Sequence, residues 1–301
     1  MTSVAFDASL HPIPPSSIER LSRDPTSSGG LADIWKCLWT TEHLEVAVKG
    51  IRITDSRDEQ AIQQTMNTLR RKVAVWVMLK DPHVLTLHGT VSGFGPLPAL
   101  VFTWMQKGEL HGYLKRTELT MERKLQLLKQ VVDGLRYLHQ MDVIHGDLTS
   151  SKNNVVIDSN GNALLADFGL SAALAEGDRS YGDSYLTSAV RWLAPELTDI
   201  DIDENTGPPR VPRPTKQSDI FSLGCIMLEV FSGKLPFWWH KTAQQVFGSR
   251  RTHQEPYRPQ PDVSIDQRHL AFMRRCWSVK PKNRPTIGHA SSFVKSELAK
   301  V

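Results

Sequence analysis

The sequence of 301 residues predicts an α+β fold that forms one large domain or one domain with two lobes. Two observations lead to this prediction. Strand-like segments with short turns fill most of residues 27–103, with one helical segment between them. Beyond that point, apolar residues recur at helical spacing over 120–140, and the apolar stretch 220–231 is typical of a buried core helix.

The composition is that of an ordinary globular protein, with 40% hydrophobic and 23% charged residues. The net charge of +4 comes without a basic run, so the sequence does not favour a nucleic-acid partner. The most apolar stretch is too short to span a bilayer and contains Glu229. Three widely spaced cysteines form no disulfide framework, which predicts a reducing, cytoplasmic location.

The first third of the chain predicts a small sheet with one helix. Residues 1–17 contain proline and serine without periodicity, so we expect a flexible tail. Two strands joined by a glycine turn follow, and a third strand ends near Ile53. A helix is predicted over 58–80, ending before Pro82. Two more strands are expected over 84–90 and 99–103.

The stretch 143–169 carries the residues that suggest chemistry. Two short apolar strands, 155–158 and 163–166, are joined by Asn160-Gly161, a strong signal for a two-residue hairpin turn. Such a hairpin brings Asp147 and Asp167 close together, although 20 positions separate them in the sequence. Two carboxylates there suit a site that handles a proton and a metal-bound phosphate.

The order His145-Gly146-Asp147-Leu148, an asparagine, then Asp167-Phe168-Gly169 resembles the catalytic centre of eukaryotic protein kinases. The resemblance implies that Asp147 accepts the proton of the substrate hydroxyl and that Asp167 binds magnesium. His145 and Phe168 are then structural residues of the same centre.

Asn154 is the expected second metal ligand, although the loop after Asp147 is two residues longer than the family pattern. The usual position, five after Asp147, holds Lys152, and an ammonium group cannot bind a cation. Asn154 directly precedes the next apolar strand, which favours it over Asn153. The alternative is that both asparagines only shape the turn.

The strands before residue 50 resemble the glycine-rich loop and the Val-Ala-x-Lys strand of protein kinases. The match is partial, since Ser27 and Ala32 stand where two of the glycines are usual. The alternative interpretations are that the turn at Gly29 is an ordinary glycine turn between strands and that Lys49 is exposed to solvent. The segment after Phe102 would then be a plain connection from a strand to a helix. The resemblance implies a catalytic Lys49 that pairs with ATP phosphates, a gatekeeping Phe102 and adenine-binding backbone groups. The implied ATP-binding residues are Ser27, Gly29, Gly30, Ile34, Ala47, Lys49, Phe102, Thr103 and Met105.

The second half of the chain continues the resemblance. Arg191-Trp192 before Ala194-Pro195-Glu196 is similar to the activation-segment end of tyrosine kinases and tyrosine-kinase-like kinases, after a polar stretch over 176–188. The whole set of motifs resembles the tyrosine-kinase-like group. In the family, Arg284 pairs with Glu196, and Asp219 holds the backbone of the catalytic loop. The resemblance covers about residues 20–298 and implies a protein kinase fold. In that fold, residues 18–103 form a small lobe and residues 104–301 form a larger, mainly helical lobe. Residues 199–214 are expected to be a surface insertion.

The resemblance implies an enzyme that transfers the γ-phosphate of ATP, with Mg²⁺ or Mn²⁺, to serine or threonine of a protein substrate in preference to tyrosine. The alternative is a pseudokinase that binds nucleotide or acts as a scaffold. It is favoured by the partial glycine loop, the long catalytic loop, Ala189 in place of a serine or threonine, and Lys72 where a helix glutamate should pair with Lys49. Gly146 replaces the usual arginine, which suggests different regulation. A small-molecule kinase fits less well, because Ala-Pro-Glu with its arginine belongs to kinases of protein substrates.

Overall fold

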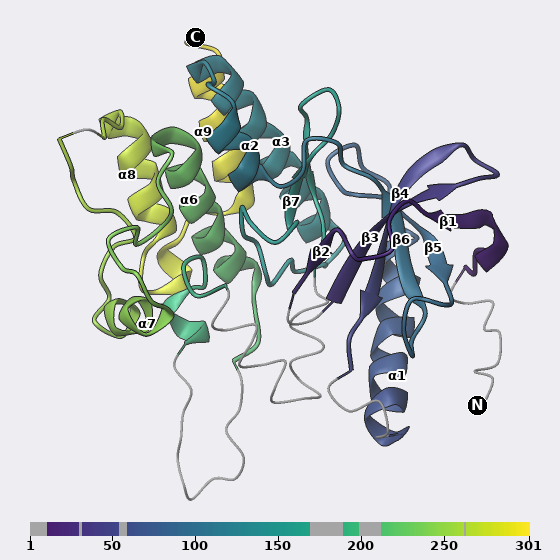
Figure 1. Cartoon of the computed structure of the whole chain (residues 1–301). Helices are drawn as coiled ribbons and strands as arrows, with labels where there is room; N and C mark the ends of the chain where they lie inside the picture. The colour runs from purple at the N-terminus through teal and green to yellow at the C-terminus, as the bar shows by residue number, and fades with distance from the viewer. Residues whose placement is uncertain (1–10, 30–31, 54–58, 169–188, 199–211, 262) are drawn as a thin grey trace, which may run out of the picture. The chain divides into compact units, whose positions relative to one another are not determined.

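The computed structural model describes residues 11–29, 32–53, 59–168, 189–198, 212–261 and 263–301. The chain divides between Gln106 and Lys107 into two compact units, which we call the N-terminal and the C-terminal unit. The first holds an antiparallel sheet and one helix, and the second is mainly helical (Figure 1). The predicted α+β fold is therefore confirmed.

The sheet of the N-terminal unit has the strand order β1-β3-β4-β6-β5, with β2 paired to β3. Its strands are β1 (Ile18–Arg20), β2 (Ser27–Ser28), β3 (Ala32–Trp39), β4 (Leu44–Ile51), β5 (Leu87–Val91) and β6 (Ala99–Thr103). Alternate residues of the central strands, among them Cys37, Val46, Val48 and Val101, form a buried apolar cluster. This pattern follows from the two-residue period of a strand, which sends every second side chain to one face.

Helix α1 (Glu59–Trp76) buries Leu69, Val73 and Trp76. The Trp76 ring meets the Phe102 ring edge-on at 5.6 Å between centroids, so the end of the helix packs on β6. The helix ends four residues before the predicted residue 80. Strand β5 also begins later than predicted, because Asp81 holds the chain in a turn: its carboxylate accepts from His83 N and its carbonyl accepts from Val84 N.

Residues 11–17 do not form the flexible tail that we expected, while residues 1–10 lie outside the described residues. Ile13 is 5% exposed and belongs to the apolar cluster of the sheet. Its N–H donates to Thr90 O at 2.7 Å, and a 3₁₀ turn, Pro15–Ser17, leads into β1. The prediction was wrong because one buried isoleucine and two backbone bonds attach this segment, and neither gives a periodic signal.

The C-terminal unit is built on helices α2 (Leu110–Arg116), α3 (Met121–Gln140), α6 (Lys216–Ser232), α7 (Ala243–Arg251), α8 (Gln267–Cys276) and α9 (Ile287–Leu298). Thr120 caps α3 by accepting from Arg123 N, as its position before the apolar repeat suggests. Helix α6 begins with a capping box at Thr215 and ends at Gly233, whose φ is 71°. Its residues 218–231 are all buried, which confirms the predicted core helix.

Strands β7 (Val155–Ile157) and β8 (Ala163–Leu165) form the predicted hairpin. Its turn is one residue longer than we predicted. The last pair of the hairpin is Asp158 and Asn162, because Asp158 N donates to Asn162 O. Within the turn, Gly161 N donates to Asp158 O, and Gly161 has a φ of 87°. The Asp158 carboxylate also accepts from Asn162 N at 2.7 Å, which favours the longer loop. Within the described part of the chain, no helix is long and apolar enough to cross a membrane.

Candidate active site

Asp219, in the first turn of α6, fixes the backbone that leads into Asp147. Its carboxylate accepts from the N–H groups of His145 and Gly146, both at 2.9 Å, and contacts His139 Nε2 at 2.8 Å. Gly146 has a φ of 73°, a conformation that costs glycine little. The first turn of α6 therefore fixes the start of the segment 145–154, which we call the catalytic loop after its predicted role.

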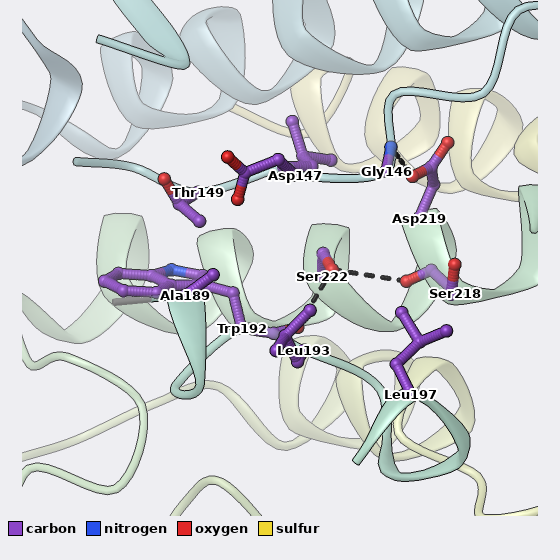
Figure 2. Close-up of a pocket in the computed structure, with 11 residues that line it drawn as sticks. Gly146, Asp147, Thr149, Ala189, Trp192, Leu193, Leu197, Ser218, Asp219 and Ser222 are labelled. Atoms are coloured by element: carbon purple, nitrogen blue, oxygen red, sulfur yellow. Dashed lines mark hydrogen bonds between the residues drawn. The ribbon is translucent and has the colours of Figure 1, made fainter. Parts of the chain in front are cut away.

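Asp147 itself is 5% exposed and lines a small cavity (Figure 2). Its N–H points at His145 Nδ1 at 3.4 Å. Burial lowers the pKa of His145, which favours the neutral ring that can accept this hydrogen. The same ring meets Phe168 edge-on, with 6.2 Å between centroids. His145 and Phe168 thus pack against one another beside Asp147.

The long catalytic loop returns to the core at Asn154. Lys152 and Asn153 both have φ of 62°, a left-handed conformation that accommodates the extra length. Asn154 is 2% exposed, and its amide nitrogen donates to Asp147 O and to Thr149 Oγ1. Of the two asparagines at the end of the loop, Asn154 is therefore the one that is buried and bonded to the Asp147 backbone.

Asp167 follows β8, and its φ is 59°. Residues other than glycine take this conformation infrequently, and such positions gather at functional sites. The bond from Ala166 N to Asn154 O, at 2.9 Å, continues the pairing by one residue beyond Val155 and Leu165, and Asp167 follows directly. The β7–β8 hairpin thus lies between Asp147 and Asp167 along the chain.

The side chains present fit a divalent cation. Asp167 offers a carboxylate and Asn154 an amide oxygen, which are ligands that Mg²⁺ prefers. No three His, Cys, Asp or Glu side chains among the described residues form a metal cluster. Mg²⁺ does not need one, because it is usually held by one or two carboxylates together with waters and substrate phosphates.

In the N-terminal unit, four of the predicted ATP-binding residues share one face of the sheet. Directly opposite residues of antiparallel strands point to the same face. Lys49 lies opposite Ile34, and Ala47 lies opposite Phe102. Since Ala47 and Lys49 are two residues apart on β4, all four side chains face the same side. This is the face on which Trp76 of α1 packs.

The remaining predicted ATP-binding residues that the structure describes lie at or just after the ends of strands. Ser27 is exposed in β2 opposite Ile34, and Gly29 N donates to Ala32 O at 2.9 Å. Thr103 ends β6, and Met105 comes just after the bond from Trp104 N to Glu45 O. Gly30 lies outside the described residues, as do residues 169–188 of the predicted activation segment and residues 199–211 of the predicted insertion.

Glu196 and Arg284 form the predicted pair in the C-terminal unit. The guanidinium donates to both carboxylate oxygens, at 2.6 and 2.7 Å. Ala194, Pro195 and Leu197 beside Glu196 are buried, so the segment before the pair is anchored. Two-point pairing of this kind fixes direction as well as distance.

A model of the family described as protein tyrosine and serine/threonine kinase matches residues 23–293. The chain belongs to this protein kinase family. The sheet face with Lys49, the loop held by Asp219, and the Glu196–Arg284 pair are therefore parts of a kinase domain.

The relatives of this kinase domain carry kinase names. Serine/threonine-protein kinase BCK1/SLK1/SSP31 of Saccharomyces cerevisiae is 28% identical over 90% of the chain and 18% of its own length. Serine/threonine/tyrosine-protein kinase HT1 of Arabidopsis thaliana is 28% identical over 86% of the chain and 61% of its own length. Mitogen-activated protein kinase kinase kinase 9 of the same plant is 31% identical over 80% of the chain and 28% of its own length. The chain thus spans less than two thirds of each.

Lys72 remains the clearest departure of this kinase domain from the family pattern. It lies within α1, half-buried, one turn before Trp76. Because Trp76 contacts Phe102, this part of the helix lies over the same sheet face that carries Lys49. A lysine thus stands on this face at the position where the family pattern has the glutamate that pairs with the strand lysine.

Sequence reasoning missed two residues that support the catalytic loop. His139 of α3 is buried against Asp219, and Glu229 of α6 bonds to Ser150 Oγ of the loop and to His111 Nδ1 of α2. The backbone bond from His111 N to Ser150 O, at 2.9 Å, completes this link. A signal existed for Glu229, which is the one charged residue in the apolar stretch 220–231. A buried acid needs a partner, although the sequence does not say which.

Proposed function

We propose that this chain is an active protein kinase that transfers the γ-phosphate of ATP to hydroxyl groups of protein substrates. The observation that carries the proposal is the arrangement of the catalytic loop in the C-terminal unit. Asp219 holds its start, Asn154 bonds to the backbone of Asp147, and the β7–β8 hairpin returns the chain to Asp167. These are the elements that phosphoryl transfer needs, because the reaction depends mostly on positioning and charge neutralisation.

Each residue then has a definite role. Asp147 accepts the proton of the substrate hydroxyl, and Lys49 pairs with the ATP phosphates. Asp167 and Asn154 hold Mg²⁺ or Mn²⁺, which neutralises phosphate charge when it is bound. Ala47, Ile34 and Phe102 supply an apolar sheet face for the adenine ring, beside backbone groups of Thr103 and Met105. Ser27, Gly29 and Gly30 belong to the turn that covers the phosphates.

Serine or threonine is the proposed acceptor in preference to tyrosine. The support is the resemblance of the chain to the tyrosine-kinase-like group together with relatives that are named serine/threonine kinases. A cytoplasmic setting is part of the same proposal, because all three cysteines are free thiols inside the fold.

The pseudokinase alternative rests on Lys72 and on the missing hydroxyl at Ala189. One assay separates the two functions: phosphotransfer from labelled ATP to a general protein substrate, with Mg²⁺ and with Mn²⁺. The matched control is Asp147→Asn, which keeps the shape of the side chain and removes the proton acceptor. Transfer by the wild type that falls at least about a hundredfold in the control supports the kinase. No transfer by either protein supports the pseudokinase, and equal transfer by both shows that Asp147 does not carry the measured reaction.

The same assay tests the acceptor. Phosphoamino-acid analysis of the autophosphorylated protein is expected to yield phosphoserine and phosphothreonine. A product that is mainly phosphotyrosine refutes this part of the proposal.

A further inference from the structure

A small cavity lies beneath the catalytic loop, between Asp147, the segment that contains Ala189 and Trp192, and the start of α6 (Figure 2). Its volume is about 10 Å³. That is about the space that one water molecule needs when polar groups surround it. Asp147, Thr149, Ser218 and Ser222 contribute polar atoms to its lining.

Trp192 brings an unused hydrogen-bond donor to this cavity. The side chain is 4% exposed, and its ring Nε1–H has no acceptor among the residues that the structure describes. In Figure 2 the ring nitrogen lies on the edge of the ring that faces Thr149 and Asp147. A buried N–H without a partner is costly and uncommon, so this donor calls for an acceptor.

The catalytic loop offers the acceptors on the other side. Thr149 Oγ1 donates to Ser151 O at 2.7 Å and accepts from Asn154 Nδ2 at 3.2 Å. A hydroxyl oxygen has two lone pairs, so one is left for a second donor. The carboxylate of Asp147 lines the same cavity. Ala189 contributes only a methyl group, which leaves room between the two sides.

We propose that this cavity binds one water molecule, which accepts from Trp192 Nε1–H and donates to Thr149 Oγ1 and to the Asp147 carboxylate. Trp192 is then a positioning residue that orients the proton acceptor through a bridging water. The water takes the place of a hydroxyl that the side chain of Ala189 lacks. The effect on turnover rests on the proposed kinase function, whereas the site itself does not.

The first test is direct observation in the crystal structure of the wild-type chain and of Trp192→Phe. The expected result is a water within about 3.2 Å of Trp192 Nε1 and of one acceptor on the loop. In the phenylalanine variant this water should be lost or displaced. A cavity without density in the wild type, or one filled by a side chain of the protein, overturns the proposal.

The second test compares Ala189→Thr with Ala189→Val, two side chains of nearly the same shape. Both displace the water, but only threonine supplies a hydroxyl in its place. The threonine variant should keep a turnover about fivefold or more above that of the valine variant, with similar KM for ATP, and should melt at a higher temperature. Equal melting temperatures for the pair overturn the water site.

The two proposals fail in different ways. If the wild type transfers no phosphate, the proposed function fails, while the crystal structure and the melting comparison still decide the water site. If turnover is normal but the pair of variants melts alike and no water is seen, only the water site fails.

Discussion

Arg284 binds Glu196 through two parallel hydrogen bonds, of 2.6 and 2.7 Å, although 88 residues separate them in the sequence. The arginine side chain is 0% exposed and also donates to the carbonyl oxygens of Ser278 and Gln217. Its guanidinium lies 5.2 Å from the centre of the Phe221 ring on α6. One side chain thus connects the end of the activation segment to the core helix.

We predict that Arg284→Ala lowers the free energy of unfolding by about 3 kcal/mol, because the Glu196 carboxylate and the two carbonyl oxygens lose their hydrogen-bond donor. Chemical denaturation measures this loss. Arg274→Ala is the control, since Arg274 pairs with Glu255 at the surface and both side chains are nearly half exposed, at 47% and 46%. The control should change stability little. If both variants lose the same stability, the buried pair has no special weight.

Nucleotide should stabilise the wild-type chain. At a concentration one hundred times Kd, ATP with Mg²⁺ is expected to add about 2.7 kcal/mol to the free energy of unfolding. A thermal melt with and without nucleotide measures the shift. Lys49→Met should reduce it, because the phosphates lose a cationic partner. A melt that millimolar ATP does not move with either metal contradicts nucleotide binding.

Lys72→Glu should strengthen nucleotide binding or raise turnover. The change places a carboxylate in the turn of α1 before Trp76, where it can attract Lys49 instead of repelling it. Titration with nucleotide and initial rates measure the two effects. Arg71→Glu is the matched control, because it makes the same change of charge on the neighbouring, exposed position. If Lys72→Glu behaves like the control, another acid pairs with Lys49.

Asn154→Ala should raise the concentration of Mg²⁺ needed for half-maximal turnover by about tenfold or more, whereas Asn153→Ala should not. The reason is that Asn154 is buried and bonded to the Asp147 backbone, while Asn153 is a left-handed turn residue. A magnesium titration of the two variants decides. The reverse order assigns the ligand to Asn153, and no effect in either leaves Asp167 as the sole protein ligand.

The three cysteines should not react with a thiol reagent in the native protein at pH 8. Burial raises the pKa of Cys37 to about 11 and that of Cys225 to about 12, and it raises the pKa of Cys276 as well. All three side chains are inaccessible, so little thiolate is present or reachable. Three thiols should appear after unfolding in denaturant. Rapid labelling of the native chain contradicts this packing.

The sequence by itself determined the parts of this kinase that depend on local chemistry. The apolar repeat after Thr120, the buried run before Gly233 and the short strands around Asn160-Gly161 predicted their elements because side-chain period and turn residues act over a few positions. The order of Asp147, Asp167 and Glu196 indicated the protein kinase family for the same reason. Motif residues sit at fixed distances along the chain.

Only the tertiary structure decided which distant groups meet. Nothing in the pattern around Ile13 signals that it packs on the sheet, because its burial depends on the neighbours that β5 and β4 provide. Glu229 could be recognised as needing a partner, but Ser150 and His111 are selected by the packing of α2 and the catalytic loop against α6. A hydrogen bond between groups far apart in the sequence forms only after the helices and loops that carry them have packed together. A pattern along the sequence therefore does not predict which two groups come within bonding distance.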